Sequence, residues 1–304
     1  MCSQELPSSV ARAINSLFQL KQLMAEHNLM RITGSRVSVS QRASCLLLVV
    51  CALFSAAACT SSPAVVPSAK ADLVTESDEP ESRTRARRHL TLAVLYFNDG
   101  KTTIALDALK QSITADPNWF EAYNLRGLIY MRLNDSVLAE DSFKRALALE
   151  PKSAAVQHNY GRLLCKQSKL TEASMMFRSA LANPTYGDRA KTWMTLAECQ
   201  LEAGQRKDAE VSFQKAFELD TANPFTVYNL ALLMFQRGDY VRAQFFARRL
   251  NNGDFANAES LWLGVRVERK LGNSDAASQL AGQLKKRFSQ SREYAAFEQG
   301  NFDE

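Results

Sequence analysis

The sequence predicts an all-α fold, a solenoid built from about six helix pairs. Two observations favour it: alanines recur at a nearly constant interval, and turn-forming residues recur between them. Beyond residue 84 no long stretch alternates Val, Ile or Thr with polar residues, as half-buried strands do. The marker alanines lie 34, 34, 36, 34 and 33 residues apart, and they are Ala105, Ala139, Ala173, Ala209, Ala243 and Ala276.

Other positions recur with these alanines. Twelve residues before each one stands a small residue, where two helices would cross too closely for a larger side chain: Ala93, Gly127, Gly161, Ala197, Ala231 and Gly264. Four residues after each one, at helical spacing, stands a residue predicted to pack back across the pair: Leu109, Phe143, Phe177, Phe213, Ala247 and Leu280. Only Ala247 is undersized in this second set.

Turn-forming residues define the helix boundaries. Those between the two helices of a pair are Gly100, Asn134, Gly204, Gly238 and Gly272, and prolines mark the junctions at Pro117, Pro151, Pro184 and Pro224. This period and these positions are typical of tetratricopeptide (TPR) repeats. We therefore predict a right-handed superhelical solenoid over residues 86–290, with repeats at 86–119, 120–153, 154–189, 190–223, 224–256 and 257–290. A polar tail, 291–304, is predicted to finish or cap the last helix.

Residues 1–58 have the order of parts of a leader and signal peptide. Three arginines precede an apolar run from Cys45 to Phe54, which is too short for the roughly 20 residues of a membrane-spanning helix. A start at Met30 would give a signal of ordinary length, so residues 1–29 are predicted to be superfluous. A genuine N-terminal extension is the alternative.

The small residues before Cys59 resemble the lipobox of bacterial lipoproteins, although Ala56 stands where that pattern usually has Leu. The resemblance implies that Cys59 is acylated and anchors the chain to a membrane. Because residue 60 is Thr rather than Asp, resemblance to Gram-negative sorting implies the periplasmic face of the outer membrane. Residues 59–85 are rich in Ser, Pro, Ala and Glu, which predicts a flexible tether.

Two cysteines, Cys165 and Cys199, lie in successive repeats of the predicted solenoid. An oxidising compartment would allow a bond between them, but sequence alone does not decide connectivity. The interpretation favoured by the sequence is two separate, partly buried thiols. Neither has a second Cys or a His at metal-ligand spacing, so no metal site is predicted.

Charge and motifs exclude several function classes. Residues 59–304 hold 37 − 5 = 32 basic and 32 − 2 = 30 acidic residues. This near balance lacks the excess of basic residues that is typical of nucleic-acid-binding proteins. The histidines, His27, His89 and His158, have no partners that suggest a catalytic triad, and there is no phosphate-binding glycine loop. We expect a binding scaffold without catalytic residues, cofactor or small-molecule substrate.

A TPR solenoid presents an extended concave surface. Resemblance to the repeat family implies that four positions of each first helix face this groove. The apolar residues there are predicted to hold a helix or extended segment of a partner protein, or else to be covered internally: Leu90, Val94, Phe97, Leu128, Met131, Phe225, Tyr228, Leu232 and Phe235. The corresponding positions of repeats three and four are mixed, with His158, Arg162 and Lys191 among them. A carboxylate clamp of the cochaperone type is not expected, because Leu90 and Val94 replace its polar residues.

The chain resembles the PilF/PilW family of type IV pilus biogenesis lipoproteins. The features that carry this resemblance are the lipobox, the tether, the six repeats and the stretch Asn183-Pro184-Thr185-Tyr186. The run from Tyr240 to Leu250 and the tail around Tyr294 add to the resemblance. It implies a pilotin, a lipoprotein that helps the secretin reach the outer membrane and oligomerise there. The alternatives are a periplasmic adaptor for another cell-envelope complex and an inner-membrane scaffold with an uncleaved signal.

Overall fold

The computed structural model describes residues 78–302. The leader, Cys59 and most of the predicted tether lie outside the described residues. Those that are described form thirteen α-helices and no strand, and this confirms the all-α prediction. The helices are α2 (Glu81–Asn98), α3 (Thr102–Ala115), α4 (Phe120–Arg132), α5 (Ser136–Leu149), α6 (Ala154–Lys166), α7 (Leu170–Leu181), α8 (Arg189–Glu202), α9 (Arg206–Leu219), α10 (Pro224–Gln236), α11 (Tyr240–Asn251), α12 (Ala258–Lys270), α13 (Ser274–Phe288) and α14 (Arg292–Gln299).

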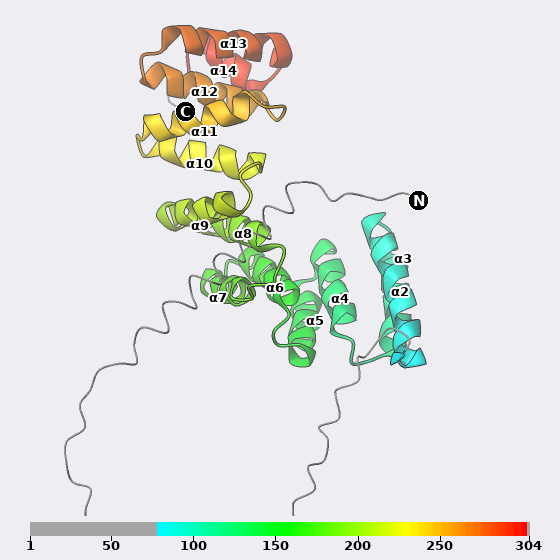
Figure 1. The fold of residues 1–304 in the computed structure, drawn as a ribbon. Helices are drawn as coiled ribbons and strands as arrows, with labels where there is room; N and C mark the ends of the chain where they lie inside the picture. The colour runs from blue at the N-terminus through cyan, green and yellow to red at the C-terminus, as the bar shows by residue number, and fades with distance from the viewer. Residues whose placement is uncertain (1–77, 303–304) are drawn as a thin grey trace, which may run out of the picture. The chain divides into compact units, whose positions relative to one another are not determined.

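Helices α2 to α13 pack as six successive pairs, from α2 with α3 to α12 with α13 (Figure 1). The second helix of each pair also packs against the first helix of the next, so each pair chiefly contacts its neighbours. Helix α2 begins at Glu81, so residues 81–85, predicted as tether, are helical. The pair α2 and α3 forms the first repeat of the described solenoid.

In the second and third pairs, the second helix lies in close contact with the glycine that the period places on the first helix. An added Cβ on Gly127 would lie 2.5 Å from a ring carbon of Phe143, and one on Gly161 would lie 2.9 Å from Phe177. Both rings are completely buried. Of the marker alanines, the first five are fully buried, whereas Ala276 is half-buried and its neighbour Ala277 is the buried one.

The turn inside each pair contains one residue in the left-handed region, where a side chain strains the backbone. Glycine supplies it in four repeats, and Asn134 supplies it at φ 60° in the second. In the third repeat the position is Ser168, at φ 59°. Serine is not a usual left-handed residue, so sequence patterning missed this turn.

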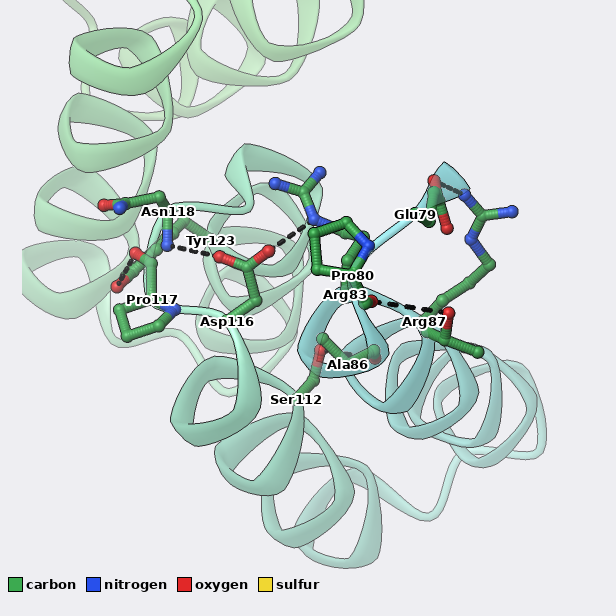
Figure 2. A network of polar contacts seen from close by, with 11 residues as sticks. Glu79, Pro80, Arg83, Ala86, Arg87, Ser112, Asp116, Pro117, Asn118 and Tyr123 are labelled. Carbon is green, nitrogen blue, oxygen red and sulfur yellow. Dashed lines mark hydrogen bonds and ion pairs between the residues drawn. The ribbon is translucent and has the colours of Figure 1, made fainter. Parts of the chain in front are cut away.

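The junction between pairs is held by a side chain that mimics a backbone turn. In Figure 2, Asp116 Oδ1 accepts a hydrogen bond from the backbone nitrogen of Asn118 at 3.0 Å, and the other carboxylate oxygen pairs with Arg83 of α2. The same backbone-to-side-chain contact recurs at later junctions, at 3.3 Å for Lys152 to Glu150, 3.0 Å for Thr185 to Asn183 and 3.1 Å for Ala222 to Asp220.

The C-terminal tail is not simply polar. It forms α14, which packs on α12 and α13. Trp262 of α12 packs against the aromatic residues of the tail, with ring centroids 5.3 Å apart for Phe302 and 6.4 Å apart for Phe297. Tyr294 is 7% exposed. The tail therefore covers an apolar face of the last described pair.

Cys165 of α6 and Cys199 of α8 form a disulfide, with their Cα atoms 5.7 Å apart. The interpretation as two separate thiols is wrong. The two residues lie 34 positions apart, which is one repeat, and they therefore occupy equivalent places in successive first helices. The stacking of α8 on α6 brings these helices side by side, and that proximity is a property of the tertiary structure.

No helix within residues 78–302 combines the length and the apolar character needed to cross a membrane.

The close approach at Gly127 generates a stability prediction. Gly127→Ala should lower the free energy of unfolding by about 1–3 kcal/mol, because the buried Phe143 ring must shift to admit the methyl group. Gly282→Ala in α13 is the matched control, because an added Cβ there meets nothing within 4 Å and should gain about 1 kcal/mol in helix propensity. Urea unfolding followed by circular dichroism measures both, and equal stability of the two variants would contradict the packing argument.

Candidate functional site

Residues from the first four repeats line a cavity of about 480 Å³. It lies between the C-terminal ends of α2 and α4, the length of α6 and the start of α8. Phe97, Leu128 and Met131 supply its apolar side. These are three of the five residues predicted for the first apolar patch of the groove.

The other two residues of that patch lie elsewhere. Leu90 is half-buried and packs into the core between α2, α3 and α4, and Val94 is 38% exposed without lining the cavity. Met131 is only 6% exposed, so it forms the floor of the cavity rather than a free surface. The structure thus concentrates the predicted patch at the C-terminal ends of two helices.

The second predicted patch, on α10, is divided. Tyr228 and Leu232 line a cavity of about 380 Å³ together with residues of α12 and α14. Phe235 is 8% exposed, packs against Tyr240 and lies under the guanidinium of Arg266. Phe225 is 43% exposed and lies beside Phe213 without lining that cavity. Phe235 is therefore covered by other residues of this chain, which is the alternative to partner binding given above.

Charge distinguishes the first cavity. Its lining includes four basic residues, Arg132, Arg162, Lys166 and Lys191, and one acidic residue, Asp188. The guanidinium of Arg132 stacks 3.7 Å from the centre of the Phe97 ring and donates to the Phe97 carbonyl. Sequence patterning placed Arg162 and Lys191 in the groove but described their repeats only as mixed. The sequence does not show that Arg162 and Lys191 lie beside the apolar residues of repeats one and two, because this proximity depends on how the repeats stack.

His158 also lines this cavity and is 3% exposed. Its Nδ1 is 2.8 Å from Thr192 Oγ1, and that hydroxyl donates to the backbone oxygen of Asp188 at 3.0 Å. A carbonyl oxygen only accepts, so the single hydroxyl proton of Thr192 is used there. We therefore assign the proton of the imidazole to Nδ1, which leaves Nε2 as a bare acceptor.

Burial lowers the pKa of His158 to about 4, and the positive charges of Arg162 and Lys191 act in the same direction. Asp188 opposes them with a smaller effect. The imidazole is consequently neutral at pH 7. Its Nε2 has no hydrogen-bond partner among the described residues.

The described part of the chain contains no group of three or more His, Cys, Asp or Glu side chains that could hold a metal ion.

Comparison with known proteins defines the class. Residues 90–154 and 190–223 each match a tetratricopeptide-repeat family model. The solved structure of Pseudomonas aeruginosa PilF matches with a TM-score of 0.65 and 25% identity, covering 73% of this chain and 100% of that one. The structure of PilW, a type IV pilus biogenesis factor, matches with a TM-score of 0.60 and 26% identity, covering 70% and 97%.

The fold and these matches define a TPR solenoid protein. In sequence, the chain is 26% identical over 226 residues to the type IV pilus assembly protein PilF of Pseudomonas aeruginosa, a match that covers 74% of this chain and 88% of that protein. It is a homologue of PilF, similar in structure to PilF and PilW, as the sequence resemblance implies.

The depressed pKa of His158 has a stability consequence. The folded value lies below the ordinary 6.5, so the unfolded chain binds the proton first as the pH falls. The contribution of the neutral imidazole to the free energy of unfolding is therefore complete above pH 6.5. It should decrease as the pH falls from 6.5 to 4, by up to about 3 kcal/mol. Urea unfolding at several pH values measures this loss, and NMR titration of the imidazole Cε1 proton measures the pKa itself.

His158→Asn is the comparison for both measurements, because it removes the imidazole and identifies its NMR signal. The variant should lose less stability over this pH range. An identical loss in both proteins, or an imidazole that titrates near pH 6.5, would contradict the assignment.

Proposed function

We propose that this protein is a pilotin, a lipid-anchored TPR scaffold of type IV pilus biogenesis that brings the secretin to the outer membrane and promotes its oligomerisation. The observation that carries the proposal is the homology to PilF over 74% of the chain. The similarity to PilW, a type IV pilus biogenesis factor, supports it. The cavity on the first four repeats supplies a place for a partner segment.

In this proposal the lipid anchor and the solenoid have different roles. Acylated Cys59 holds the chain at the periplasmic face of the outer membrane, and the solenoid holds a segment of the secretin. Two or more acyl chains give stable anchoring, since each buried CH₂ contributes about 0.8 kcal/mol. Tethering raises the effective concentration of bound subunits at the membrane where they must assemble. The scaffold provides binding and position, and no chemical step is required of it.

The apolar side of the first cavity is the proposed contact for the secretin. Phe97 and Leu128 are both half-buried, so part of each side chain remains available to a partner. They come from different repeats, and the partner segment would therefore lie across the boundary between repeats one and two. The predicted binding role of Leu90 and Val94 is secondary in this geometry, because neither lines the cavity.

Cells that lack this protein should lose heat-stable secretin multimers from the outer membrane, and the wild-type gene should restore them. Phe97→Glu with Leu128→Glu should fail to restore them, because two charges would enter the apolar side of the cavity. The matched control is Val137→Glu with Val211→Glu, two side chains that are 79% and 60% exposed and line no cavity described above. Fractionation and immunoblotting of the secretin are the measurement.

Circular dichroism checks that each variant is helical, and Phe97→Ala with Leu128→Ala replaces the Glu pair if that pair unfolds. Normal multimers in cells without the protein would refute the pilotin function and favour an adaptor for another envelope complex. Normal multimers with a folded Phe97 and Leu128 variant would refute only the contact.

Anchoring has its own test. Cys59→Ser should remove the protein from the outer-membrane fraction, because the thiol is the proposed acylation site. The matched control is Ser61→Ala, two residues further into the predicted tether, which should leave the protein membrane-bound. Retention of Cys59→Ser in the outer-membrane fraction would contradict lipid anchoring at this residue.

A further inference from the structure

The Nε2 atom of His158 is a fully buried acceptor without a partner among the described residues, and His158 is one of the residues that line the cavity. Leaving a buried polar atom without a hydrogen bond costs free energy, so such atoms are normally completed by another protein group, an ordered water or a ligand. The hydrogen bonds through Thr192 to the Asp188 carbonyl hold the ring in place and fix the proton on Nδ1. A ligand that satisfies Nε2 would therefore have to donate a hydrogen bond to it.

The surrounding charge defines the rest of the ligand. Arg162, Lys166 and Lys191 make no ion pair with any described residue, and Asp188 is the one acidic group of the cavity lining. Glu198 lies within electrostatic reach of Arg162 without forming an ion pair to it in the described structure. Three such cations beside one carboxylate favour a negatively charged ligand.

The apolar side of the cavity indicates which class of negatively charged ligand fits, namely a peptide. Phe97, Leu128 and Met131 lie in the same cavity as these cations. A small anion would leave the exposed parts of Phe97 and Leu128 uncovered, whereas an extended chain can place an apolar side chain on them and an acidic one next to it. Its backbone N–H, or a hydroxyl, can satisfy the acceptor.

We propose that this cavity binds an extended acidic segment of a partner protein, with a carboxylate toward Arg162 and Lys191, a donor on His158 Nε2 and an apolar side chain on Phe97 and Leu128. The proposal rests on the proposed function insofar as that function makes the solenoid a scaffold for protein segments. Beyond that function, the proposal specifies that the bound segment is acidic, and it names the residues of the cavity that recognise the segment.

The probe is a library of decapeptides with random residues at every position, passed over immobilised full-length protein in detergent. The bound fraction should be enriched in Asp and Glu relative to the input, with an apolar residue nearby. A selected peptide, labelled with fluorescein, should lose at least about ten-fold in affinity with Arg162→Gln and Lys191→Gln combined. Arg178→Gln with Lys207→Gln is the matched control, since both side chains are exposed and outside the cavity lining.

Two conservative variants test the acceptor. Asn at position 158 can keep the hydrogen bond to Thr192 but lacks an acceptor at the place of Nε2, whereas the longer Gln can present one there. His158→Asn should therefore weaken the selected peptide about five-fold and His158→Gln should weaken it less. NMR should show the His158 Cε1 proton shifting when the peptide binds.

No acidic enrichment, or enrichment that survives loss of Arg162 and Lys191 in a protein that is still helical, would overturn the proposal. A peptide of residues 70–81, the acidic stretch that leads into α2, is the competitor. If it displaces the selected peptide with equal affinity and the same dependence on Arg162 and Lys191, the occupant is this chain and the partner assignment falls. Secretin multimers in cells are scored separately, so failure here is distinguishable from failure of the pilotin function.

Discussion

The close approach of two helices inside each repeat is the constraint on which the rest of the structure depends. A residue without a bulky side chain on the first helix lets a large buried side chain on the second reach the helix backbone, as Gly127 does for Phe143 and Gly161 for Phe177. This contact sets the distance between the helices of a pair. Each pair chiefly contacts its neighbours, so the packing within one pair determines the surface on which the next pair stacks. The cavity then arises from stacking, since its residues come from four repeats.

The first and last repeats differ in how their apolar faces are covered. In the last repeat, α14 places Tyr294, Phe297 and Phe302 near Trp262, so this pair is covered by its own chain. In the first repeat, Phe97 remains half-buried and lines the cavity beside Arg132. Both predicted apolar patches line a cavity, of about 480 Å³ near α2 and α4 and of about 380 Å³ beside α10. Four basic residues and one acidic residue line the first, whereas two of each line the second, and this charge difference favours the first repeats as the binding region for an acidic segment.

The cavity combines three features that together favour the binding of a ligand. It holds a neutral imidazole among cations, a buried acceptor without a partner and basic side chains without ion pairs in the described structure. Local departures from polar satisfaction are expected at functional sites, and in our proposal the ligand is the missing partner of His158 Nε2. In contrast, the equally buried Glu268 is satisfied by Gln244, Arg248 and Asn273, and it belongs to the framework of the solenoid.

The sequence by itself determined the repeat, because period, small residues and turns depend on contacts within one helix pair, and such contacts recur at fixed spacing. Resemblance to the repeat family also implied that Phe97, Leu128, His158 and Arg162 lie on the groove face of their helices. Only the tertiary structure decided which of these positions meet in one cavity, that Cys165 is bonded to Cys199, and that the tail folds back as α14. Each of these depends on how neighbouring repeats are rotated and stacked, and that geometry is set by the packing of many side chains rather than by any local pattern.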